Sequence, residues 1–125
     1  MIDSFYLFSS TAKKLIIDTV KTLTEVNEKS TLHVYCIVTD LSYGLLDIVF
    51  SKDGEKIQLS DPRVNVIFEQ LLTNKKQFHL TLKNVSRNDT GHYGCTTAKS
   101  FPTLLSSINI TVKGEWAILT LIRHH

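Results

Sequence analysis

The chain has 125 residues, of which 42% are hydrophobic, and 14 Lys and Arg stand against 12 Asp and Glu. This length suits one domain with a hydrophobic core, and the near-balanced charge does not indicate nucleic acid or an acidic membrane surface as a partner. The two cysteines are too few for a disulfide-dense miniprotein or a cysteine-only zinc site, and no apolar run approaches the ~20 residues that cross a bilayer.

The sequence divides into a central domain and two flanking segments. Residues 1–14 are expected to be an N-terminal extension, because their short apolar patch lacks the basic flank of a signal peptide. Residues 15–114 are expected to form the domain. Residues 115–125 are expected to be a tail, either the start of a stalk or anchor, a strand extension, or cloning-derived sequence, and the two final histidines belong to it rather than to a metal site.

Apolar and polar residues alternate with a period of two along most of the central segment, which predicts β-strands. An amphipathic helix over residues 12–26 is the one competing interpretation. Strands are predicted over residues 32–36, 46–51, 57–59, 63–68, 78–83, 93–97 and 107–112. Asp53-Gly54 is a hairpin signal between two of them. Many short strands separated by turn signals predict an all-β sandwich or barrel.

Cys36 and Cys95 both fall on the inward-facing register of a predicted strand. A disulfide between two sheets would satisfy that pattern and would stabilise the fold by about 4 kcal/mol in the chain-entropy model. Two reduced, buried cysteines would satisfy it as well, because a free cysteine behaves as a small apolar residue.

Residues 89–95 read D-T-G-H-Y-G-C, a D-x-G-x-Y-x-C pattern with a cysteine upstream. This run resembles the immunoglobulin superfamily, and the resemblance implies a two-sheet Greek-key sandwich with one inter-sheet Cys36–Cys95 disulfide. It also implies a tyrosine corner, in which the Tyr93 hydroxyl bonds back to upstream backbone. Gly91 would permit the tight turn into the strand.

Other positions extend the resemblance over residues 15–114. Arg63 matches the arginine that starts strand D and pairs with Asp89. Phe50 takes the place of the family's core tryptophan, which implies a somewhat smaller core. Lys29 stands where a glycine is common. The F-G-x-G signature of rearranged antigen receptors is missing, which argues against an antibody or T-cell-receptor chain. The 59-position spacing of the cysteines and the room for further strands over residues 56–77 favour a variable-type domain (V-set, or a short variable or intermediate type), and the resemblance implies a leukocyte cell-surface receptor.

The candidate binding surface is the front sheet, strands G, F, C and C′, with two loops at its end. Small side chains are expected to face out of this sheet, at positions 49, 51, 94, 96 and 98, and to leave it flat. An ordinary solvated sheet is the alternative. The B–C loop (39–45) and the F–G loop (99–105) add aromatic side chains, which are enriched in binding hot spots. The candidate ligand-binding residues are Tyr43, Val49, Thr96, Phe101 and Pro102.

Three Asn-x-Ser/Thr sequons, at Asn84, Asn88 and Asn109, fit a glycosylated extracellular protein. The first two flank the E–F turn, and the third points outward from strand G. We therefore expect an extracellular domain on a single-pass membrane protein, with secretion as the alternative.

Catalytic motifs are missing from the sequence, and its interior histidines His33, His79 and His92 are expected on exposed positions without ligand spacing. No enzyme activity, cofactor, metal, nucleic acid or small-molecule substrate is expected. The expected partner is another cell-surface protein. The alternatives are a homophilic adhesion or structural module, including a homodimer, and a dimeric co-receptor chain that recognises an antigen-presenting molecule.

Overall fold

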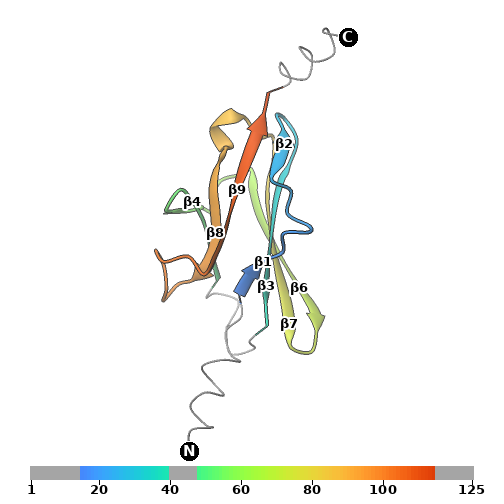
Figure 1. The fold of residues 1–125 in the computed structure, drawn as a ribbon, viewed down its shortest axis with the longest axis vertical. Coiled ribbons are helices and arrows are strands. Elements are labelled where there is room, and N and C mark those ends of the chain that lie inside the picture. Colours follow the sequence, from blue (N-terminus) through green and yellow to red (C-terminus); the bar gives the residue numbers. More distant parts are fainter. Residues whose placement is uncertain (1–14, 40–47, 115–125) are drawn as a thin grey trace, which may run out of the picture.

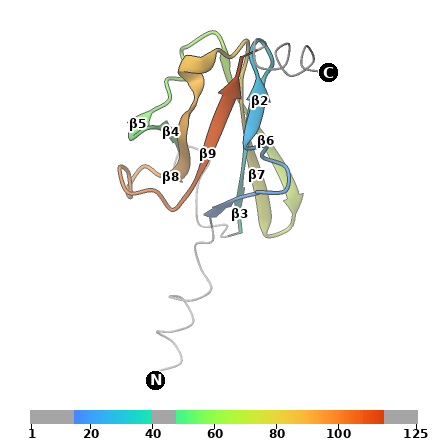
Figure 2. The same ribbon diagram turned by 45° about the horizontal axis from the view of Figure 1, so that its top comes forward.

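The computed structural model describes residues 15–39 and 48–114, and they form two β-sheets that pack face to face (Figures 1 and 2). One sheet has the strand order β1-β3-β7-β6 and the other β2-β9-β8-β4-β5. The strands are β1 (Leu15–Ile17), β2 (Glu25–Asn27), β3 (Leu32–Val38), β4 (Ile48–Lys52), β5 (Glu55–Lys56), β6 (Val64–Leu72), β7 (Lys75–Leu82), β8 (Gly91–Thr97) and β9 (Ser106–Lys113). The expected extension, the expected tail and Tyr43 lie outside the described residues.

The core lies between the sheets and follows the alternation of the sequence. In β3, the residues at every second position from Leu32 to Val38 are fully buried. Cys36 of β3 and Cys95 of β8 are also fully buried and form a disulfide with a Cα–Cα distance of 6.6 Å. Phe50 lies opposite Cys95 in the register of β4 and β8 and is 6% exposed. The predicted all-β sandwich with one inter-sheet disulfide is confirmed.

The Asp53-Gly54 hairpin is confirmed as well. Lys52 pairs with Glu55, so the loop between β4 and β5 has two residues. Their φ angles are +50° and +88°. Two successive residues with positive φ are typical of a type I′ turn, whose twist matches that of the strands it joins.

One competing interpretation and one prediction of secondary structure are wrong. The described part of the segment 12–26, for which a helix is the competing interpretation, instead contains β1 and β2. Leu15 and Ile17 are buried while β1 pairs with β3, and the Asp18 carboxylate then accepts the N–H groups of Val20 (3.0 Å) and Lys21 (3.3 Å) in a turn that follows the strand. Pairing with a neighbouring strand thus outweighs a weak helical pattern.

The strand predicted over residues 57–59 is also absent, because β5 ends at Lys56. The Ile57 N–H still donates to the Phe50 carbonyl at 2.9 Å, but Asp61 N–H donates to the Gln58 carbonyl at 3.2 Å in a turn that leads towards β6. None of the described residues forms a helix with the length and hydropathy that a bilayer crossing needs.

Candidate binding surface

The turn between β7 and β8 is held by one carboxylate. Arg63 donates to Asp89 through both terminal nitrogens, Nη1 to Oδ2 at 3.1 Å and Nη2 to Oδ1 at 3.3 Å. The Ser86 N–H donates to the same carboxylate at 2.9 Å, and the Tyr93 hydroxyl donates to the Asp89 carbonyl. The structure thus contains both the Arg63–Asp89 pair and the Tyr93 hydroxyl bond that the resemblance implies.

The charged groups at this corner form hydrogen bonds with each other and with the backbone. Burial alone would raise the pKa of Asp89, but the hydrogen bonds from Arg63 and Ser86 lower it below its ordinary value. Burial raises the pKa of Tyr93. These groups tie the start of β6 to the turn between β7 and β8, and their hydrogen bonds are made within the fold.

Gly91 has a different role from the predicted one. Gly54 is the only described glycine with φ in the left-handed region, so Gly91 is not needed for a left-handed turn. A Cβ at Gly91 would instead lie 2.7 Å from a carboxylate oxygen of Asp53. That carboxylate accepts the His92 N–H at 2.9 Å, so the glycine leaves room for a bond between the β4–β5 turn and β8.

The front face of the five-stranded sheet is covered by the loop between β8 and β9, which is the F–G loop (99–105) of the sequence analysis. A Cβ at Gly94 would lie 2.5 Å from a methyl carbon of Leu104, and the Thr96 hydroxyl donates to the Thr103 carbonyl at 2.8 Å. Ser51, which lies opposite Gly94, and Thr96 are fully buried. The expected flat, exposed face is therefore wrong at positions 51, 94 and 96, and Thr96 is not available to a ligand.

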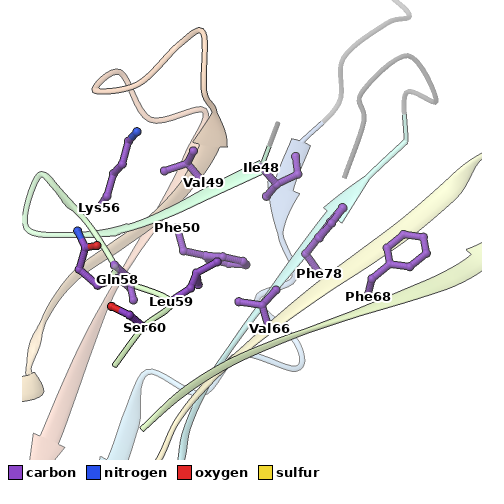
Figure 3. Close-up of a pocket in the computed structure, with 11 residues that line it drawn as sticks. Ile48, Val49, Phe50, Lys56, Gln58, Leu59, Ser60, Val66, Phe68 and Phe78 are labelled. Atoms are coloured by element: carbon purple, nitrogen blue, oxygen red, sulfur yellow. The ribbon is translucent and has the colours of Figure 1, made fainter. Parts of the chain in front are cut away.

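Three candidates remain on or beside the loop. Val49 and Phe101 are partly exposed, and Pro102 is exposed. The ammonium of Lys56 lies 5.3 Å from the centre of the Phe101 ring, which places the ring beside β5. Val49 and Lys56 extend away from Phe50, out of the core (Figure 3). The sequence offered no signal that the loop would fold back, because alternation shows which face a residue takes but not what covers it.

The described residues contain no group of three or more His, Cys, Asp or Glu that could hold a metal ion. No protein-family model and no curated protein matches the chain, but solved structures do.

The chain is similar to the BTLA ectodomain with a TM-score of 0.53 and 16% identity, over 82% of this chain and 99% of that one. Its TM-score is 0.56 against the N-terminal eight Ig domains of Down Syndrome Cell Adhesion Molecule, at 16% identity over 82% of this chain and 13% of that one. Against Dpr2 Ig1-Ig2 in complex with DIP-Theta the TM-score is 0.51, at 19% identity over 85% and 51%.

The chain has an immunoglobulin fold. In the strand letters of that fold, β3 and β7 are B and E, β8 and β9 are F and G, and β4 and β5 are C and C′. The disulfide joins B to F, as the resemblance implied.

The asparagines of the three sequons, Asn84, Asn88 and Asn109, are all exposed. Asn84 has a left-handed backbone, with φ +52°. Asn88 lies in the 3₁₀ turn Arg87–Asp89. Asn109 contacts His92 through its side-chain oxygen at 2.7 Å, which leaves the amide nitrogen, the atom that a glycan would modify, outside that bond. Whether the sequons are used stays a prediction.

The other sheet carries a cluster that the sequence analysis missed. His33 Nδ1 and His79 Nε2 are 2.7 Å apart, and the His79 ring stacks on Tyr35 at 4.0 Å. The two histidines are partly buried, so the expectation of solvated rings is wrong. Burial, with His33 and Lys21 nearby, lowers the pKa of His79, whereas Glu69 raises it. Alternation placed these residues on one face, but only the strand register brings them together.

Proposed function

We propose that this immunoglobulin-fold domain is the extracellular, protein-binding part of an immune-type cell-surface receptor. The buried Cys36–Cys95 disulfide supports an extracellular location, because disulfides persist in oxidising compartments. The exposed sequon asparagines support it too. Similarity in fold to the BTLA ectodomain and to a cell adhesion molecule agrees with this role, but fold alone does not assign function.

The F–G loop carries the proposal. Its backbone is braced by bonds from Phe101 N–H to the Thr97 carbonyl (3.0 Å) and from Thr103 N–H to the Ser100 carbonyl (2.8 Å). A loop that is ordered before binding loses less conformational entropy on contact with a partner. We propose that Phe101 and Pro102 form the contact, with Val49 and Lys56 beside them.

The sequons leave this surface accessible. Asn109 lies opposite His92, near the start of β8, whereas the F–G loop follows the opposite end of that strand. Asn84 and Asn88 lie around the E–F turn. Glycans at all three sites would therefore cover the E–F end of the sandwich and leave the F–G end free.

The strand content favours a short variable or intermediate type of domain. A full variable domain adds strands C′ and C″ to the front sheet. Here C′ is the two-residue β5, and residues 57–63 between β5 and β6 form no strand. Attachment to a leukocyte membrane by a single span is part of the proposal.

The test is a binding screen of the full chain, displayed as a tetramer, against an array of cell-surface ectodomains. We expect the wild-type chain to bind a protein and Phe101→Ala to weaken that binding at least tenfold, since the ring is the main apolar anchor. Thr24→Arg, an exposed position beside β2, is the control and should bind like wild type.

Two results would overturn the proposal. If Val49→Arg abolishes binding while Phe101→Ala does not, the sheet rather than the loop makes the contact. If Thr24→Arg weakens binding as much as Phe101→Ala, the loop is not the binding surface. Circular dichroism of each variant separates loss of contact from loss of fold.

A further inference from the structure

The strand β6 presents a long unpaired edge. It has nine residues and pairs only with β7 in the described part of the chain, at the outer side of the four-stranded sheet (Figures 1 and 2). The other outermost strands of the two described sheets are short: β1 and β2 have three residues each and β5 has two. Unpaired N–H and C=O groups along an edge are a template for another strand.

The backbone pattern identifies which groups face outward. The Lys83 N–H donates to the Arg63 carbonyl at 3.0 Å, so Arg63 bonds towards the β7 side. Hydrogen-bonding direction alternates along an antiparallel strand. The N–H and C=O groups of Val66 and Phe68 therefore point to the free edge, whereas those of Ile67 point to β7.

The centre of this edge lacks the usual protection. In natural proteins, lysine, proline or a β-bulge keeps an edge strand from pairing with another chain. Pro62 precedes β6, and the register shifts between Gln70 and Leu72 near its end, but residues 64–69 contain neither device. Glu69 is the only charged residue in the strand. Ile67 is 48% exposed and Phe68 is 40% exposed.

An apolar cavity opens beside the same edge. It has a volume of about 570 Å³ and is lined from both sheets, by Val66, Phe68 and Phe78 on one side and by Phe50 with Leu59 on the other (Figure 3). Leu59 is 67% exposed. A strand added to β6 would bring every second side chain to the mouth of this cavity.

We infer that the occupant is a second copy of this chain, with the two β6 strands paired antiparallel about a two-fold axis at Ile67. In this register Ile67 meets its own equivalent, Val66 lies opposite Phe68 of the second copy, and Asn65 lies opposite Glu69 of the second copy. No like charges meet. The outward amides of Val66 and Phe68 bond across the seam, and their side chains, with those of the second copy, cover the cavity mouth and Leu59.

The pattern of β6 favours a second copy because the strand complements itself. An isologous contact needs one patch that matches its own image, and an apolar strand with a single off-centre charge provides one. One strand pair and a groove bury less than the ~1,200 Å² of a standard interface, so the dimer is weak. It uses the sheet edge of β6 and leaves the F–G loop free, so it does not depend on the function proposed above.

Sedimentation equilibrium of the full chain tests the dimer. Between about 1 and about 300 µM, a range that brackets weak interfaces, the weight-average mass should rise from that of one chain towards that of two. Ile67→Lys should raise the dissociation constant at least tenfold, because two lysines would meet on the axis. Ile16→Lys is the matched control, since Ile16 is 57% exposed on β1 at the opposite edge of the sheet, and it should dimerise like wild type.

Cysteine trapping tests the register. Ile67→Cys should form an inter-chain disulfide on mild oxidation, because opposed residues of a non-hydrogen-bonded pair are about 4.5 Å apart at Cα. Asn65→Cys, on the same face, should not, since the two copies of position 65 are about 14 Å apart. A wild-type chain that stays monomeric at the highest concentration, equal loss in Ile16→Lys, or equal trapping at position 65 would overturn the inference.

Discussion

Lys29 has a backbone conformation that is unfavourable for its side chain. Its φ is +71°, in the left-handed region, and its N–H donates to the Val85 carbonyl at 2.7 Å. This geometry fits the glycine that the resemblance places at this position, since glycine adopts it without a steric cost.

We predict that Lys29→Gly raises the free energy of unfolding by about 0.5–1 kcal/mol, because removing Cβ relieves strain while the backbone bond stays. Urea denaturation of the full chain measures it. Lys83→Gly, an exposed lysine without positive φ, is the control and should lose stability. A Lys29→Gly variant that is no more stable than wild type would show that the turn carries no strain.

Residues with short, local signatures could be predicted from the sequence, and residues that depend on a distant neighbour could not. The spacing of Asp89 and Tyr93 before Cys95 is itself the tyrosine corner, so those contacts follow from the motif. Gly91 belongs to the same run, yet its reason is the Asp53 carboxylate, which arrives from the β4–β5 turn. No pattern within the run predicts that approach.

At the scale of elements, β3 and β7 carry a titratable pair on their outer face. His33 and His79 share a contact of 2.7 Å next to Tyr35, with Lys21 nearby. Burial is the main cause of the lowered pKa of His79, followed by His33 and Lys21. The unfolded chain therefore binds more protons than the folded one, and stability falls as pH drops through the ordinary histidine pKa of about 6.5.

We predict that lowering the pH from 7.5 to 5 costs the wild type more unfolding free energy than it costs His79→Gln, in which the group no longer titrates. Urea unfolding at both pH values measures this difference. His92→Gln, which removes an exposed histidine from the other sheet, should keep the wild-type response. An identical pH response in wild type and His79→Gln would contradict the prediction.

Periodicity predicted the elements that alternate cleanly and failed where the chain turns. β3, β7, β8 and β9 lie where the alternation placed them. The segment before Glu25 allowed a helical interpretation, and the pairing of β1 with β3 decided its structure instead. The front face was assigned to the correct side of the sheet, but Leu104 covers it, and no periodicity reveals a loop that folds back.

At the scale of the whole molecule, one covalent bond joins the sheets. Cys36 and Cys95 are both fully buried, and the chain between them forms a long loop in the unfolded state. Restricting such a loop lowers the entropy of the unfolded chain.

We predict that the double variant Cys36→Ala/Cys95→Ala loses about 4 kcal/mol of unfolding free energy, a large share of the stability of a domain this size. Equilibrium denaturation measures the loss, and non-reducing mass spectrometry of the wild type verifies the bond. A loss below about 1 kcal/mol would show that the packed sheets suffice without it.

The contacts between the F–G loop and the sheet restrict where this loop tolerates substitutions and insertions. The Thr103 carbonyl accepts a hydrogen bond from Thr96, and Leu104 lies over Gly94. Residues inserted at Thr103 or Leu104 would therefore uncover the face of the sheet. In the segment from Lys99 to Pro102, which precedes that part of the loop, Lys99 and Pro102 are exposed and Ser100 and Phe101 are partly exposed. A library of variants for altered binding, or an inserted peptide tag, therefore belongs between Lys99 and Pro102, with Thr103 and Leu104 kept as in the wild type.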